Sequence, residues 1–130
     1  MQIIVLQSLE EDLSFVLRRV ADLNPKRAAE ILFTQSPNKV LQWVREGEEA
    51  LVISSNVLHV QPDYGGRLAT TVKRTNRRVL FFIFSNMPRL VGEDESSVDG
   101  YIPKHDVSGT GNLDTYGFRL LARILTSDLE

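Results

Sequence analysis

The chain has 130 residues, 42% of them hydrophobic, which fits one compact domain spanning residues 1–130. Lys and Arg number 15 against 17 Asp and Glu, and this near balance gives no electrostatic reason to expect nucleic acid or an anionic membrane as partner. The sequence has no cysteine, which excludes disulfides, thiolate metal sites and cysteine nucleophiles. Because no leader precedes the first strand and no apolar run reaches the ~18 residues that span a bilayer, we expect a soluble, cytoplasmic domain.

The first half of the chain alternates apolar runs with amphipathic segments. Residues 3–6 predict a strand covered on both faces, and Ser8 is the predicted N-cap of a helix that ends near Asn24. That helix buries a stripe made of Leu9, Leu13, Val16, Leu17 and Val20. Residues 28–34 predict a second strand, Ser36-Pro37 begins a second helix, and residues 50–54 predict a third strand.

The second half continues the same alternation. A short helix is predicted over residues 68–75, and the most apolar run, residues 78–84, is expected to be the central strand. The next segment is so rich in proline, glycine and acids that its helix should be short or absent. A fifth strand at residues 98–102 and a terminal helix at 113–125 complete the pattern.

This order predicts an α/β fold with a doubly wound, five-stranded parallel sheet between two helical layers, a flavodoxin-like three-layer sandwich. Ligands of such sheets bind at the carboxyl ends of the strands. The residues that follow strands one, three, four and five are Gln7 and Ser8, Ser55, Ser85, and Lys104.

In topology and at these positions the chain resembles the receiver domains of response regulators, over nearly its whole length. In the family that it resembles, an acidic pair stands at the positions of Gln7 and Ser8, and a phosphorylatable aspartate at the position of Ser55. A Ser or Thr stands at the position of Ser85, and a lysine at that of Lys104. The hydroxyl and the lysine are kept, whereas the acids are replaced. Phosphoryl transfer to a carboxylate needs that carboxylate and others to hold Mg²⁺. We therefore expect a degenerate pseudo-receiver with no catalytic residue, metal or cofactor.

Such a domain would act by phosphorylation-independent protein–protein interaction in a regulatory system. Its partner would be a kinase, an output domain or another signalling protein, and pairing with a second copy of the chain is an open alternative. Phe15 lies opposite the apolar stripe of its helix, which predicts an exposed anchor for a partner. The residues expected at the interaction surface are Phe15, Arg18, Arg19, Met87, Leu90, Val91 and Tyr101.

Two other classes of function are open from the sequence. The Gly-rich turn at residues 108–112 resembles a phosphate cradle, which would suit a small-molecule, flavin or nucleotide sensor. A hydrolase or phosphotransferase centred on Ser55 would need an adjacent base, and neither His59 nor His105 is placed by sequence to serve as one. A basic cluster at Lys73, Arg74, Arg77 and Arg78 is read as a solvated face, with docking of an acidic segment as the alternative.

Overall fold

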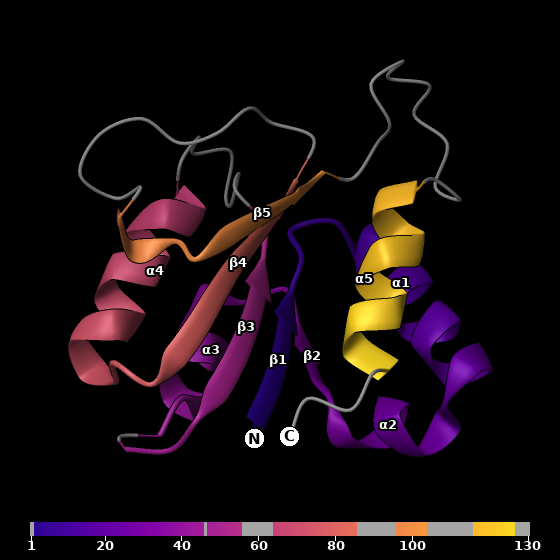
Figure 1. The fold of residues 1–130 in the computed structure, drawn as a ribbon, viewed down its shortest axis with the longest axis horizontal. Coiled ribbons are helices and arrows are strands. Elements are labelled where there is room, and N and C mark those ends of the chain that lie inside the picture. The colour runs from indigo at the N-terminus through magenta and orange to yellow at the C-terminus, as the bar shows by residue number, and fades with distance from the viewer. Residues whose placement is uncertain (1, 46, 56–63, 86–95, 104–115, 127–130) are drawn as a thin grey trace.

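The computed structural model describes residues 2–45, 47–55, 64–85, 96–103 and 116–126 (Figure 1). Two successive helices stand between the first and second strands, and otherwise its elements follow the predicted alternation. They are β1 (Gln2–Leu6), α1 (Glu10–Leu23), α2 (Pro25–Glu30), β2 (Leu32–Thr34), α3 (Pro37–Trp43), β3 (Ala50–Ser54), α4 (Tyr64–Thr75), β4 (Val79–Ser85), β5 (Gly100–Pro103) and α5 (Tyr116–Thr126). In the described part of the chain, no helix combines the length and apolar character that crossing a bilayer requires.

The five strands form one sheet in the order β2-β1-β3-β4-β5, and each neighbouring pair is parallel. This is the flavodoxin-like order, so the predicted fold class is confirmed. The chain moves outward from β1 first to β2 and then, on the other side, to β3. The carboxyl ends of β1 and β3 therefore lie side by side at the position where the strand order reverses, which is where such sheets place their sites.

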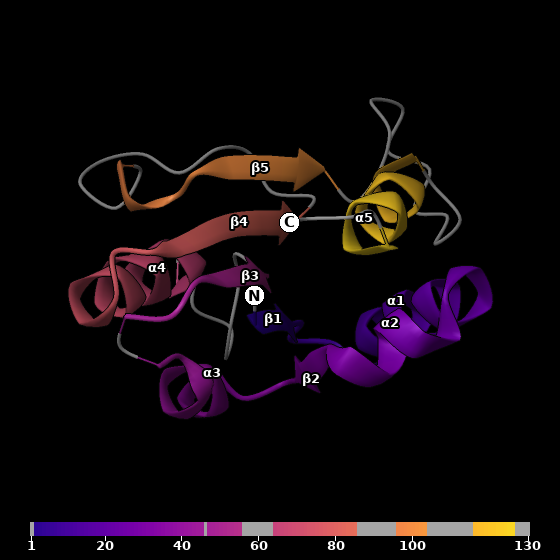
Figure 2. The ribbon, with the colours of Figure 1, turned by 60° about the horizontal axis from the view of Figure 1, so that its bottom comes forward.

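Helices cover both faces of the sheet, in three layers (Figures 1 and 2). One face carries α1, α2 and α5, and the other carries α3 and α4. Successive side chains of a strand point to opposite faces, so each buried strand contributes to two cores. Val5 and Ile53 pack with Val16 and Leu121 on the first face. On the second face the core is built by Ile4, Leu6, Val40, Val52, Leu68, Val72 and Phe81.

Two expectations about the strands are wrong. The predicted strand at residues 28–34 is α2 followed by a three-residue β2. The helix forms there because Pro25 stands in its first turn and the side chain of Asn24 accepts a hydrogen bond from Arg27 N at 3.1 Å. The central strand is β3, which is buried throughout, whereas β4 leaves Leu80 45% exposed. The sequence pointed to β4 as the central strand because β4 has the larger apolar side chains. In the folded chain, however, it is β3 whose residues are all buried.

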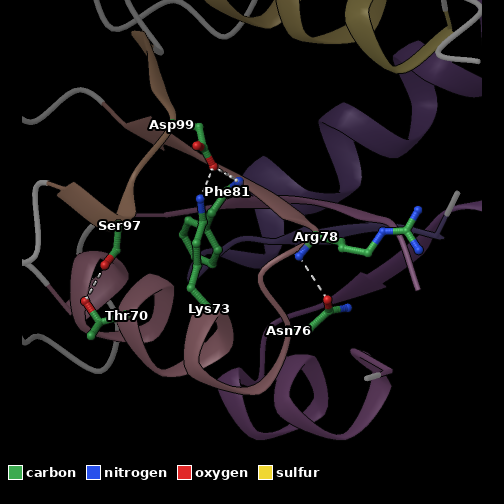
Figure 3. A network of polar contacts seen from close by, with 7 residues as sticks. All are labelled: Thr70, Lys73, Asn76, Arg78, Phe81, Ser97 and Asp99. Atoms are coloured by element: carbon green, nitrogen blue, oxygen red, sulfur yellow. Dashed lines mark hydrogen bonds and ion pairs between the residues drawn. The ribbon is translucent and has the colours of Figure 1, made fainter. Parts of the chain in front are cut away.

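Asp99 fixes the edge of the sheet to α4 (Figure 3). Its carboxylate Oδ2 accepts hydrogen bonds from Phe81 N at 2.8 Å and from Lys73 Nζ at 2.6 Å, and its own N donates to Phe81 O at 2.8 Å. Beside it, Thr70 Oγ1 lies 3.0 Å from Ser97 Oγ. One carboxylate thus joins a helix and the backbone of β4 just before β5 begins.

Candidate functional site at the carboxyl ends of the strands

Gln7 and Ser55 meet at the carboxyl ends of β1 and β3. Both are buried, with 0% and 2% of their surfaces exposed. Ser55 Oγ donates a hydrogen bond to Gln7 Oε1 at 3.2 Å and accepts one from Ser8 N at 3.0 Å. Ser55 N also donates to Leu6 O at 2.9 Å, which extends the ladder past the end of β3. The Ser55 hydroxyl is therefore already used as donor and acceptor within the fold.

The network continues from β1 to β2. Gln7 N donates to Thr34 O at 3.2 Å, and Gln7 Nε2 donates to Leu6 O at 2.9 Å. Thr34 Oγ1 in turn accepts from Ser36 N at 3.0 Å. Ser8, the predicted N-cap of α1, belongs to this network instead, and Leu9 occupies the N-cap position. The strand ends are thus closed by amides and hydroxyls bonded to one another.

Ser85 ends β4 and is 9% exposed. It lies opposite Pro103 in the register of β4 and β5, so Lys104 follows directly after the residue paired with Ser85. Lys104 itself lies outside the described residues, as do His59, His105 and the turn at residues 108–112. Its predicted nearness to Ser85 stays a prediction.

One buried carboxylate was not anticipated as such. Asp12, one of three acids in the first turn of α1, is only 6% exposed. Its spacing of four from Val16, itself buried, is the signal that could have placed it on the inner face. In the described ranges, acidic and histidine side chains nowhere gather in threes around a position that could hold a metal ion.

The chemistry available at Gln7, Ser8 and Ser55 is that of neutral groups. Mg²⁺ binds proteins chiefly through carboxylates, and an amide oxygen is too weak a base to deprotonate a serine hydroxyl. A base that activates Ser55 as a nucleophile would have to accept its hydroxyl proton, and the group that accepts this hydrogen bond is the amide oxygen Gln7 Oε1. This arrangement suits a stable, uncharged closure of the strand ends.

The predicted interaction residues are only partly where the sequence put them. Phe15 is half-buried and packs against the core, whereas Leu17, expected inside, is 40% exposed. Phe15 and Leu17 flank Val16 on opposite sides of the helix. The rotation of α1 about its axis turns the side that carries Phe15 toward the core that α1 shares with α5. Because helical periodicity gives the width of an apolar stripe and not its direction, the sequence could not decide between them.

Of the other predicted surface residues, Arg18 is exposed, and the Cζ atom of Arg19 lies 5.7 Å from the centroid of the Phe15 ring. Tyr101 is half-buried against the second core, and its buried hydroxyl has no hydrogen-bond partner within the described ranges. Three of the predicted residues, Met87, Leu90 and Val91, lie outside the described residues, as does most of the segment expected to lack a helix.

A groove between α1 and α5 was not predicted. It has a volume of about 510 Å³ and is lined by Arg19, Asp22, Leu23, Arg119, Ala122 and Arg123. A second hollow of about 350 Å³ adjoins it and shares Arg19 and Asp22, with Phe15 and Arg18 as its further lining. In the sequence, Arg119 and Arg123 stand four residues apart, which places them on one face of the last helix. Only the packing of α5 against α1 brings that face beside Arg19.

The predicted basic cluster is partly neutralised by acids from other elements. Lys73 pairs with Asp99, and Arg78 pairs with Glu49 at 2.9 Å while donating to Gly47 O at 2.8 Å. Arg74 and Arg77 are exposed. Lys73 and Arg78 therefore hold strands and turns together at the opposite end of the sheet from Gln7 and Ser55.

Comparison with known proteins gave no relative: no family model, no curated protein and no solved structure matches this chain. The strand order establishes the flavodoxin-like fold. A fold of this kind hosts many unrelated functions, so function has to be inferred from the residues of the site and of the surface.

Proposed function

We propose that this chain is a pseudo-receiver, a non-catalytic signalling domain that acts in the cytoplasm through phosphorylation-independent binding of a protein partner. The observation that carries the proposal is the buried hydrogen bond between Ser55 Oγ and Gln7 Oε1. It stands where the receiver resemblance expects a phosphoacceptor aspartate facing an acidic pair. The strand order is the one that receivers share with flavodoxins.

The electrostatics of the strand ends support this proposal. A receiver gathers carboxylates at one point, where Mg²⁺ relieves their mutual repulsion and phosphorylation then changes the charge. Here the Gln7 amide and the Ser55 hydroxyl bond to each other and to neighbouring backbone groups. A domain of this kind has no charge at Gln7 and Ser55 to be switched, so its signal would be a change of partner.

The test is an amide chemical-shift titration with Mg²⁺, then with beryllofluoride or acetyl phosphate in the presence of Mg²⁺. We expect the resonances of Gln7, Ser8 and Ser55 to stay unchanged up to millimolar concentrations. Saturable shifts centred on Ser55 and Lys104 would refute the proposal. The Ser55→Ala variant is the matched control, because shifts that survive in it do not arise from chemistry at the Ser55 hydroxyl.

A parallel thermal-shift measurement with flavin mononucleotide addresses the sensor alternative. A ligand that binds the folded state raises the unfolding temperature with concentration, so no change is expected from a pseudo-receiver. A concentration-dependent rise would replace the proposal with a small-molecule sensor.

A further inference from the structure

The outward face of α4 consists of arginine and threonine. Over residues 65–75 of this helix, the exposed positions follow spacings of three and four, which places them on one face. They are Arg67, Thr71, Arg74 and Thr75. The other face of the helix, with Leu68, Ala69 and Val72, is buried in the second core. The apolar side of α4 therefore holds it to the sheet, and the basic side is turned outward.

This part of the sequence supplies cations and no acid. Residues 64–92 contain neither Asp nor Glu, although the chain as a whole has more acids than Lys and Arg. Described acids from neighbouring elements reach α4 and the turn after it, and they pair there with two other cations. The pairs are Asp99 with Lys73 and Glu49 with Arg78.

Three arginines of this region are left open to a partner. Arg67, Arg74 and Arg77 are exposed, and within the described ranges their guanidinium groups form no hydrogen bond or ion pair. The helix dipole favours a cation at Arg74, in the last turn of α4, but it does not favour one at Arg67, near the amino end. The dipole of α4 alone therefore does not account for a row of arginines along its whole length.

The backbone that carries these arginines is fixed at both sides. Asp99 joins α4 to β4 through Lys73 and Phe81 N (Figure 3). At the carboxyl end of the helix, Asn76 is 4% exposed, its Nδ2 donates to two backbone oxygens at 2.6 Å, and its Oδ1 accepts from Arg78 N at 2.9 Å. The turn that presents Arg77 is therefore held in place, and a partner would have to order side chains only.

The spacing of the arginines suits one segment of a partner. Arg67 and Arg74 are two helical turns apart, about 10 Å along the axis, and the residue between them on this face is the short Thr71. The hydroxyl of Thr71 already donates to Arg67 O at 3.0 Å, so it can only accept from a ligand. Because a guanidinium group pairs with a carboxylate through two parallel hydrogen bonds, this face favours Asp or Glu side chains.

We propose that Arg67, Arg74 and Arg77 bind an acidic segment of a partner protein. This inference rests on the proposed function and gives the partner its chemistry. It places the contact on the helical layer opposite to Phe15 and Arg18, where the sequence predicted it. A membrane or a single-stranded nucleic acid fits less well, because the exposed positions over residues 65–75 offer neither an apolar side chain to insert nor an aromatic ring for stacking.

The test uses fluorescence anisotropy with a labelled peptide that alternates glutamate and serine. The matched peptide has glutamine in place of every glutamate. We expect the acidic peptide to bind saturably, the glutamine peptide not to bind, and added salt to weaken binding. If both peptides bind alike, or if the acidic one does not bind at millimolar concentration, the inference is wrong.

Charge reversal then locates the site. The double variant R67E/R74E should weaken binding of the acidic peptide at least about tenfold. The matched control is R18E/R123E, which makes the same change of net charge at exposed positions of the other helical layer and should change binding less than about twofold. Circular dichroism and thermal unfolding check that both variants fold. Equal effects of the two variants would show a non-specific charge effect and overturn the assignment.

Other occupants of this face are separate outcomes of the test. Vesicles that contain phosphatidylserine, or a DNA duplex, bound more tightly than the acidic peptide and released by R67E/R74E would overturn the proposal. A homodimer in sedimentation that the same variant dissociates would mean that the face binds a second copy, and this would also overturn it. Failure of the peptide to bind leaves the Mg²⁺ and beryllofluoride titration of the strand ends unaffected, so the two proposals can fail separately.

Discussion

Replacing Asp99 by alanine tests whether its carboxylate holds the β4–β5 edge. Phe81 is fully buried, and its N–H donates to Asp99 Oδ2 at 2.8 Å. Without the carboxylate this buried donor loses its acceptor, which costs about 1–3 kcal/mol. The ion pair with Lys73 is shared by side chains 24% and 31% exposed, so it adds about 1 kcal/mol at most. We expect Asp99→Ala to lower the free energy of unfolding by about 2–3 kcal/mol.

Two further variants separate these contributions. Asp99→Asn removes the charge but keeps an oxygen for Phe81 N, so it should cost about 1 kcal/mol or less. Lys73→Met removes the ion pair from the other side and should cost a similar amount. Urea unfolding at pH 7 measures all three, through a lower midpoint at unchanged slope. If Asp99→Asn is as damaging as Asp99→Ala, the charge and not the backbone hydrogen bond stabilises the edge, and our reasoning is refuted.

Three other substitutions test particular contacts by the same unfolding measurement. Gly100→Ala would place a Cβ 2.6 Å from Phe82 Cε1, so we expect a loss of about 1–3 kcal/mol, and a stability equal to wild type would contradict this close approach. Asn76 donates to Arg45 O and Glu48 O, both at 2.6 Å, so Asn76→Ala should cost about 2–3 kcal/mol; a loss below about 0.5 kcal/mol would show that water replaces the amide. Ser55→Ala leaves Ser8 N and Gln7 Oε1 without their partner and should cost about 1–3 kcal/mol, whereas a stabilised variant would mean that the strand ends are strained.

The candidate site was predictable in its location and less so in its contacts. Strand periodicity placed Gln7 and Ser55 at carboxyl ends, and the parallel sheet puts those ends side by side. The hydrogen bond between them depends on the register of β1 with β3, in which Leu6 lies opposite Ser54. Register is a property of paired strands, so no single segment of sequence carries it.

The sequence alone determined the alternation of strands and helices, the parallel sheet and the neutral character of the residues after β1 and β3. These features follow from local periodicity, capping and composition, each of which acts over a few neighbouring residues. The start of α2 also has a local cause, the cap at Asn24, which the predicted strand at residues 28–34 leaves out of account.

Only the tertiary structure decided which strand is central, how α1 is rotated, and where the arginines gather. Arg19 and Arg119 are far apart in sequence, and they line one groove because α5 packs beside α1 on the same face of the sheet. Likewise, Phe15 and not Leu17 is turned toward the core, because a helix rotates to bury the side that its neighbours cover. Packing between distant segments is set by the whole set of contacts, and no local pattern specifies it.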